Sequence, residues 1–354
     1  MHVAVILPRW VGDAVMATPL LRGLRAHFGS AARITGVLRP VVADLLADTG
    51  WLDACVLYDR HSRNPDRGFA AAVRRLRADR VDLALVLPDS ASAASLAWWA
   101  RARRRIGVGA GLHRILLTDA LPAAMRAEIV PPPVAFLRLG AAVGLPPQPT
   151  HLELGLSPAD ERRGDETLGQ LFPGQDGPLI VLNDNSANGV ARAWGVEKHA
   201  ALARWLVDRL PGCRVLMHCG PDDRGAAESV VAAAAHPAIQ GLSGVEDLSI
   251  GLSKAVYKRA TAAVSSDSGP RHIAAAFGVP TVALVGPTDP RSGRSDGQRC
   301  AEIRLDLPCS PCDKEVCPLR HHDCMRLITV DQVGQAVLSL LDRAPAAPRA
   351  GLAC

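Results

Sequence analysis

The chain has 354 residues, 48% of them hydrophobic, and a formal net charge of +5. It is longer than a typical single domain and apolar enough for two cores, so we expect two domains. No apolar segment is long enough to span a bilayer, and the scattered charge, without a recognisable binding motif, argues against a nucleic-acid partner.

The first half of the chain alternates between apolar strand-like stretches and helical stretches, which favours an α/β domain with a parallel sheet. No basic segment precedes the first strand, as a signal peptide would require, so we expect a cytoplasmic protein. Strands are expected at residues 2–7, 33–38, 53–58 and 81–87, and helices at residues 18–28, 40–47, 70–80, 91–105 and 123–143, the last interrupted by prolines.

Asp13 is the first candidate for chemistry. It follows the first strand in Trp10-Val11-Gly12-Asp13, and α/β sheets bind ligands at the carboxyl ends of their strands. Gly12 would let the backbone approach a ligand closely. A helix-capping role for Asp13 is the alternative.

Further along, Trp98 and Trp99 precede a run of arginines. This pattern suits either an anionic membrane surface or a solvated charged face beside a core tryptophan. Gly107 to Gly111 imitates a dinucleotide-binding loop but lacks its spacing. Residues 144–150 are rich in proline, and we expect the domain linker within residues 151–177.

The second half begins with an expected strand at residues 178–183 and a long loop of small and polar residues that ends in Arg192-Ala193-Trp194. Such a loop can enclose a ligand, and Arg192 would meet a phosphate there, unless it is an ordinary surface cation. Later elements are expected as a helix at 198–210, a strand at 214–218 and a final helix at 330–341.

Residues 260–288 predict a compact β-α-β unit. An apolar run ends at Ser-Ser-Asp267-Ser268-Gly269, a short helix with Pro270 in its first turn follows, and Thr281 to Val285 form the next strand before Gly286-Pro287-Thr288. The helix start at Gly269 favours an anion such as phosphate, and His272 can reach the same place. The alternative is an ordinary β-α-β unit with Asp267 or Ser268 as N-cap.

Cys309, Cys312, Cys317 and Cys324 form a cluster among nine cysteines. Four nearby thiols could hold a structural zinc ion. The spacing is not that of a standard zinc ribbon, His321 and His322 are competing ligands, and reduced thiols or a pair of disulfides remain open.

These motifs together resemble glycosyltransferase family 9, the ADP-heptose:lipopolysaccharide heptosyltransferases. The matching segments run from Trp10 to Met16 with Thr18-Pro19, from Asp267 to Ala276, and from Val285 to Thr288; the cysteine cluster is similar to one in heptosyltransferase II-like members. Two segments depart from the family pattern. Arg192-Ala193-Trp194 replaces a Lys-x-Trp element, and Asn183-Asp184-Asn185 replaces an opening Pro-Gly.

The resemblance implies the GT-B fold, in which two Rossmann-like domains with parallel sheets face each other across a cleft. The implied divisions are residues 1–158 for the acceptor, 175–328 for the nucleotide sugar, and a final helix at 329–343 packing back on the first domain. It also implies inverting, metal-independent transfer of L-glycero-D-manno-heptose from ADP-heptose to the acidic inner core of lipopolysaccharide, with no required cofactor and with peripheral attachment to the inner face of the cytoplasmic membrane.

In this interpretation Asp13 is the catalytic base, and Trp10 and Gly12 contact the acceptor. The donor would be bound by Arg192, Trp194, Asp267, Ser268, Gly269, His272, Gly286 and Thr288. Transfer requires a base for the acceptor hydroxyl and positive charge for the departing diphosphate. A related transferase with another nucleotide-sugar donor, a nucleotide-sugar epimerase and a non-catalytic glycolipid-assembly protein are the alternatives.

Overall fold

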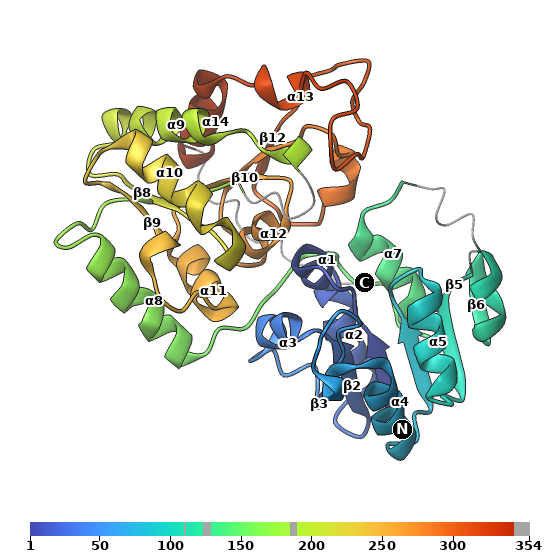
Figure 1. Cartoon of the computed structure of the whole chain (residues 1–354). Coiled ribbons are helices and arrows are strands. Elements are labelled where there is room, and N and C mark those ends of the chain that lie inside the picture. Colours follow the sequence, from blue (N-terminus) through green and yellow to red (C-terminus); the bar gives the residue numbers. More distant parts are fainter. Residues whose placement is uncertain (110, 123–128, 185–189, 343–354) are drawn as a thin grey trace. The chain divides into compact units, whose positions relative to one another are not determined.

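A computed structural model describes residues 1–109, 111–122, 129–184 and 190–342 (Figure 1). The chain divides into two compact units. The first comprises Met1–Glu161, Ile250–Lys254 and Pro290–Gly297, and the second comprises Arg162–Ser249, Ala255–Asp289 and the chain from Gln298 onward. Each unit is built on a six-stranded parallel sheet. In the described residues, we find no helix with both the length and the apolar character needed to cross a membrane.

The sheet of the first unit has the strand order β3-β2-β1-β4-β5-β6. Every residue of β1 is buried, because helices cover both faces of the sheet. Ala4 and Ile6 point toward α4 and α5, so Val3 and Val5 face the opposite layer of helices. The strands are β1 (His2–Ile6), β2 (Arg33–Leu38), β3 (Ala54–Leu57), β4 (Leu83–Val86), β5 (Arg104–Gly109) and β6 (Asp119–Pro122).

Helices of the first unit return the chain between parallel strands. They are α1 (Val11–Met16), α2 (Thr18–Phe28), α3 (Pro40–Leu46), α4 (Phe69–Ala78), α5 (Ala91–Trp99) and α7 (Pro132–Ala141), with short 3-10 turns η1 (Pro65–Arg67) and η2 (Gly111–Leu116). Helix α8 (Pro158–Leu171) occupies much of the region expected as a linker, and the two units divide within it.

The sheet of the second unit has the strand order β12-β11-β10-β7-β8-β9. Helices α9, α10 and α14 pack together on one side of it (Figure 1). The strands are β7 (Leu179–Asn183), β8 (Arg214–Met217), β9 (Ile239–Gly241), β10 (Ala262–Ser266), β11 (Thr281–Leu284) and β12 (Cys300–Ile303). The helices in this half of the chain are α9 (Val196–Arg209), α10 (Arg224–Ala234), α11 (Ile250–Arg259), α12 (Gly269–Ala276), α13 (Asp323–Arg326) and α14 (Val330–Asp342), with 3-10 turns η3 (Val190–Arg192), η4 (Pro221–Asp223), η5 (Leu242–Gly244) and η6 (Pro290–Gly293). Of these, η6 and the first half of α11 belong to the first unit.

One sequence prediction about a helix needs correction, and another falls partly outside the described residues. The helix expected through residue 105 ends at Trp99, and Arg104–Gly109 instead pairs with β4 as a strand. The run of arginines at the start of this strand resembled the charged face of a helix. In the structure, Arg104 instead donates to Asp119 of the neighbouring strand β6 at 2.9 Å. The expected helical region at 123–143 is described only from Pro132; residues 123–128 lie outside the described part.

The final helix, Val330–Asp342, makes its described contacts within the second unit; its expected packing on the first domain stays a prediction. Helix α14 packs on α9 and on β10, β11 and β12 of the second unit. The Trp205 indole N–H donates to Asp331 at 2.7 Å. A β-carbon on Gly334 would lie only 2.6 Å from the Trp205 ring, so the glycine permits this close helix contact.

Candidate active site

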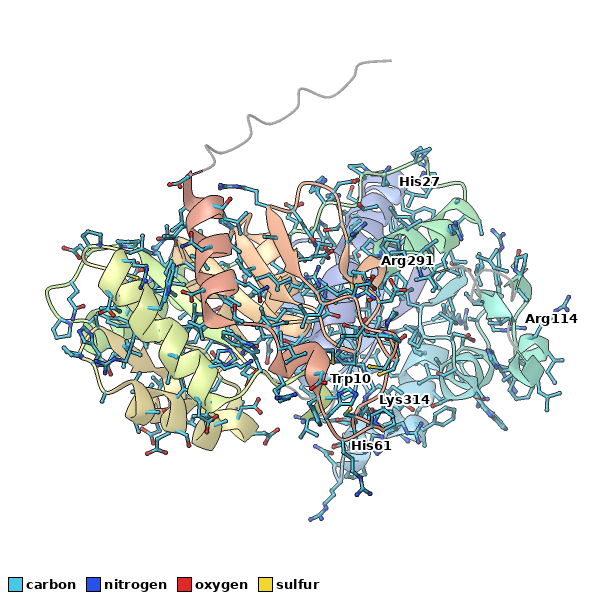
Figure 2. All side chains as sticks on the ribbon, turned by 90° about the horizontal axis from the view of Figure 1, so that it is seen from above. Trp10, His27, His61, Arg114, Arg291 and Lys314 are labelled. Atoms are coloured by element: carbon cyan, nitrogen blue, oxygen red, sulfur yellow. The ribbon has the colours of Figure 1, made fainter. Side chains whose placement is uncertain are left out.

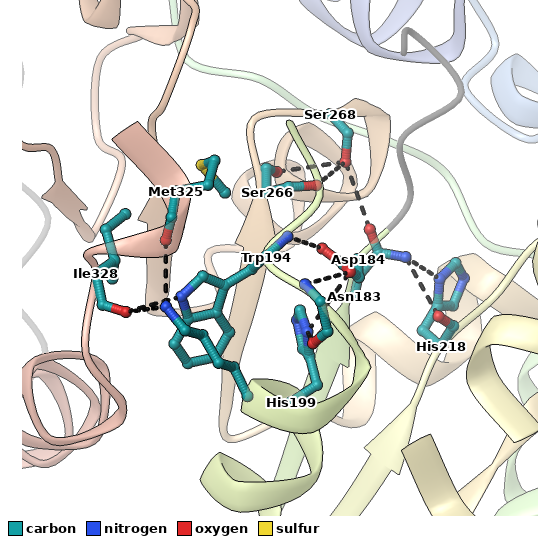
Figure 3. Close-up of polar contacts among 11 residues, drawn as sticks. Asn183, Asp184, Trp194, His199, His218, Ser266, Ser268, Met325 and Ile328 are labelled. Carbon is teal, nitrogen blue, oxygen red and sulfur yellow. Dashed lines mark hydrogen bonds and ion pairs between the residues drawn. The ribbon is translucent and has the colours of Figure 1, made fainter. Parts of the chain in front are cut away.

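The β10-α12-β11 unit has the predicted form. Its two strands are parallel neighbours, with Ala263 opposite Thr281, and Pro270 occupies the first turn of α12, where a missing N–H is harmless. Ser268 is the N-cap residue, but its hydroxyl makes no cap hydrogen bond. It lies instead 3.4 Å from Asn183 Oδ1 and 3.3 Å from the Ser266 carbonyl oxygen (Figure 3).

Asp267 is fixed by a buried ion pair. Arg271 Nη1 donates to Asp267 Oδ1 at 2.7 Å, and Arg271 Nη2 donates to Glu302 Oε1 at 2.9 Å. Burial alone would raise the pKa of the Asp267 carboxyl, but Arg271 and Thr288 outweigh it and hold the pKa below its ordinary value. Asp267 therefore remains ionised and is committed to anchoring the loop before α12.

Arg192 reaches this loop from η3. Its Nη1 donates to the Asp267 carbonyl oxygen at 3.0 Å, while its buried Nε has no hydrogen-bond partner among the described residues. A guanidinium group held in this way beside a helix N-terminus suits a phosphate oxygen, because both supply N–H donors to an anion.

His272 lies on the first turn of α12 and is buried. Burial and the neighbouring Arg271 lower the pKa of His272 to about 4, so the imidazole is neutral near pH 7. Its Nδ1 has no hydrogen-bond partner in the described part of the chain. His272 can thus offer a hydrogen bond to a ligand but not a positive charge.

Asp184 positions the segment that carries Arg192. Its carboxylate accepts hydrogen bonds from the backbone N–H groups of Trp194 at 2.8 Å and Gly195 at 3.1 Å, and lies 3.6 Å from His199 Nδ1 (Figure 3). The Trp194 indole is buried, and its N–H donates to the Ile328 carbonyl oxygen at 3.1 Å. The Trp194 ring is therefore held in the interior, against the segment that contains Ile328, and its expected contact with the donor stays a prediction.

Asn183 is the buried last residue of β7. Its Nδ2 lies 3.1 Å from His218 Nδ1, and its Oδ1 accepts from Ser268 (Figure 3). Burial lowers the pKa of His218 to about 4. The Asn-Asp pair that replaces the family's Pro-Gly therefore has a structural use: Asn183 joins three strand ends, and Asp184 holds the following loop.

The loop at residues 286–288 is supported by a cysteine-rich segment at residues 307–324, which we call the cysteine loop. Ser310 Oγ donates to the Gly286 carbonyl oxygen at 2.7 Å, and the Cys312 N–H donates to the Pro287 carbonyl oxygen at 2.9 Å. The same loop accepts the Ala191 N–H at the Glu315 carbonyl oxygen, 3.0 Å away. Thr288 is buried. It lies close enough to Asp267 to lower the pKa of that carboxyl.

The structure does not support a zinc site at the four clustered cysteines, all of which are free thiols. Burial and the other three thiols raise the pKa of Cys324, so the cysteines are neighbours. Within residues 1–109, 111–122, 129–184 and 190–342, however, no three His, Cys, Asp or Glu side chains are grouped so that they could hold a metal ion. Cys324 is buried against Gly286, while the Cys317 thiol is partly exposed, and nearby backbone N–H groups, first that of His322, lower its pKa.

Asp13, Gly12 and Trp10 lie together in the first unit, directly after β1. Trp10 is the N-cap residue of α1 and Asp13 lies in its first turn. Arg9 stacks on the Trp10 ring at 4.5 Å, and the ring is partly exposed. A carboxylate in the first turn of a helix is stabilised in its ionised form, which is the form that a general base requires.

The family profile described as glycosyltransferase family 9 (heptosyltransferase) matches residues 69–322. The chain belongs to glycosyltransferase family 9. It is therefore a glycosyltransferase, and among the alternatives raised from the sequence, the epimerase and the non-catalytic protein are set aside.

Individual family members agree with this assignment. Lipopolysaccharide heptosyltransferase 2 of Escherichia coli (strain K12) is 27% identical over 319 residues, covering 86% of this chain and 88% of that protein. Lipooligosaccharide heptosyltransferase 2 of Campylobacter jejuni is 37% identical over 79 residues, so the match spans only 25% of that relative. A solved structure, E. coli ADP-heptose LPS heptosyltransferase II, has a TM-score of 0.78 and 24% identity, covering 96% of this chain and 98% of that one. This likeness confirms the GT-B fold class.

Sequence reasoning missed several residues that shape the second unit's site. Arg271 was visible inside the Asp267–Ala276 motif, but its partner Glu302 lies on β12, a strand that was not predicted. The proximity of Asp184 to His199 was also missed, because the two residues are separated in the sequence by a loop of irregular structure. Asn183, the polar residue that ends an otherwise apolar strand, was the available signal.

Proposed function

We propose that the protein transfers L-glycero-D-manno-heptose from ADP-heptose to the inner core of lipopolysaccharide, with inversion at the anomeric carbon. The names of the relatives support the sugar and the acceptor. The main support for the donor site is the geometry of Arg192. Its Nη1 donates to the Asp267 carbonyl oxygen, while its Nε has no hydrogen-bond partner among the described residues.

The diphosphate of the donor would lie at the N-terminus of α12. Arg192 supplies the positive charge, backbone N–H groups near Gly269 supply donors, and the Ser268 hydroxyl and neutral His272 complete the hydrogen bonding. Gly286 and Thr288 would border the same ligand. Asp267 acts through position, because it anchors the loop, and the contact of Trp194 with the donor stays a prediction.

In the transfer step, Asp13 would accept the proton of the acceptor hydroxyl. The hydroxyl oxygen forms the new bond to the anomeric carbon as the bond from that carbon to the diphosphate oxygen breaks, and ADP leaves with the electron pair. Charge that develops on the diphosphate is stabilised by Arg192 and α12. Because the proposed acceptor is a glycolipid, we place the enzyme at the inner surface of the cytoplasmic membrane.

The decisive experiment is incubation of the purified protein with ADP-heptose and inner-core acceptors, followed by mass spectrometry of the product. A mass increase of one heptose, dependent on ADP-heptose, is expected. A panel of other ADP- and UDP-sugars tests the alternative donor. Transfer of a different sugar, with none from ADP-heptose, would replace the proposed donor.

A further inference from the structure

Two aliphatic side chains of η2 are exposed to an unusual degree. Leu112 is 90% exposed and Ile115 is 81% exposed, more than any other large hydrophobic side chain in the described part of the chain. Single exposed apolar residues need no explanation. Two of them within one short turn form a small apolar surface that would gain from burial against a partner.

The turn that presents these side chains is firmly held. His113 Nε2 lies 2.9 Å from Asp89 Oδ1, and Arg105 Nε donates to the Leu116 carbonyl oxygen at 2.7 Å. Leu117, immediately after the turn, is buried in the core that α5 covers. The exposure of Leu112 and Ile115 is therefore a consequence of how the turn is built, and not of a frayed chain end.

The charge around η2 favours an anionic partner. Arg114 lies between the two aliphatic residues, is exposed, and its side chain projects outward at the edge of the molecule (Figure 2). Carboxylates near the turn are already paired, Asp89 with His113 and Asp119 with Arg104. The stretch from Ile106 to Thr118, which leads into and out of η2, contains no aspartate or glutamate, and its cation is Arg114.

Topology places η2 at the same edge of the sheet as Asp13. Both segments follow the carboxyl end of a strand, η2 after β5 and Asp13 after β1. Only β4 lies between these strands, so their ends are about 10 Å apart at the usual strand spacing. Trp98 and Trp99 end α5 and precede the start of β5, which puts them at the opposite edge.

We propose that η2 docks the first unit onto an anionic lipid bilayer, with Leu112 and Ile115 inserted among the lipids and Arg114 bound to their phosphates. Exposed aliphatic side chains flanking a cation are the combination that binds such an interface. The inference rests on the proposed function in one respect: a bilayer at this edge brings a lipid-linked acceptor close to Asp13.

The test is sedimentation of the purified protein with vesicles of phosphatidylethanolamine and phosphatidylglycerol, compared with vesicles of phosphatidylcholine alone. Wild type should bind the anionic vesicles. Leu112→Ser/Ile115→Ser should lower binding at least about tenfold, and Arg114→Gln should lower it about fivefold and remove the preference for anionic lipid. The matched control is Val316→Ser/Leu319→Ser, an exposed aliphatic pair of the second unit, which should bind as wild type does.

Wild type that stays in solution, or loss of binding in a Trp98→Ser/Trp99→Ser variant with η2 variants unaffected, would overturn the docking proposal. The assay uses no sugar donor, so its outcome is separate from the transferase proposal. Heptose transfer to a delipidated acceptor without vesicle binding removes the docking surface alone. Vesicle binding that depends on η2 without any heptose transfer removes the proposed reaction alone.

Discussion

Arg271 and Asp267 form a buried ion pair one turn apart on the site-forming segment, with Nη1 and Oδ1 separated by 2.7 Å and the Arg271 side chain only 2% exposed. Arg271→Met should reduce the free energy of unfolding by about 3–5 kcal/mol, because the buried Asp267 carboxylate would keep its charge without its partner. Urea denaturation measures this. Arg259→Met, which breaks a similar but exposed pair with Asp165, should cost less than about 1 kcal/mol; equal losses would contradict the role of burial.

Replacement of Arg192 should weaken nucleotide binding without unfolding the protein. A charged hydrogen bond contributes about 1.5–3 kcal/mol, so Arg192→Ala should raise the dissociation constant for ADP about 10- to 150-fold. Isothermal titration calorimetry gives the constant. Arg162→Ala removes the same charge from an exposed position of the second unit and should leave it unchanged. An unaltered constant in Arg192→Ala would remove this residue from the donor site.

Asp13→Asn should separate catalysis from donor binding. Loss of a general base lowers turnover by about 10²- to 10⁴-fold, while ADP affinity should stay within about twofold, since the donor residues lie on other segments. Turnover is read from ADP release and affinity from calorimetry. Asp66→Asn is a suitable control, because Asp66 also lies in the first turn of a short helix, η1. Weakened donor binding with near-normal turnover would contradict the assignment.

A methyl group on Gly286 should disturb the loop that borders the proposed diphosphate. An added β-carbon would lie 2.5 Å from Met325 Sδ and 3.3 Å from Cys324 Sγ. Overpacking of this kind costs about 1–3 kcal/mol, which thermal unfolding of Gly286→Ala should show together with lower ADP affinity. Gly286→Ala/Met325→Ala should recover part of the affinity. Gly169→Ala, with nothing within 4 Å of the new carbon, should not destabilise; similar losses in both single variants would refute the packing explanation.

Two buried histidines should make stability fall in mild acid. Burial holds the pKa of His218 and of His272 at about 4, below the ordinary 6.5. The unfolded chain therefore binds protons first, so stability is greatest above about pH 6.5 and decreases toward pH 4, by at most on the order of 3 kcal/mol per histidine.

Urea midpoints between pH 7.5 and about pH 4.5 measure this dependence. His272→Asn should flatten the slope, and His61→Asn, at an exposed loop position, should not. A slope that is the same in wild type and His272→Asn would exclude His272 as a source.

The sequence allowed the α/β class and the β10-α12-β11 unit to be predicted, because a buried strand, a first-turn proline and a terminal glycine each restrict the local backbone. Strands β5, β6, β9 and β12 were missed. These strands are short or partly exposed, as β12 (Cys300–Ile303) shows. Such segments become strands only by pairing with strands that are distant in the sequence.

In the candidate site, too, local motifs could be recognised in the sequence, whereas long-range contacts could not. Arg192 and the residues of the Asp267–His272 segment could be named from motifs, since their spacing is local. The Trp194 contact to Ile328 and the Glu302 contact to Arg271 depend on long-range contacts. Neutral His272 depends on burial, which is likewise set by tertiary structure.

The cysteine loop supports two parts of the proposed donor site. The cysteine loop holds Gly286 and Pro287 on one side and Ala191, the neighbour of Arg192, on the other. We therefore expect that neither the loop at residues 286–288 nor the segment around Arg192 can be exchanged between homologous enzymes without the cysteine loop. A chimaera designed to change sugar preference must therefore transplant residues 307–324 as well, or the grafted loops will lack the backbone partners that set their mutual spacing.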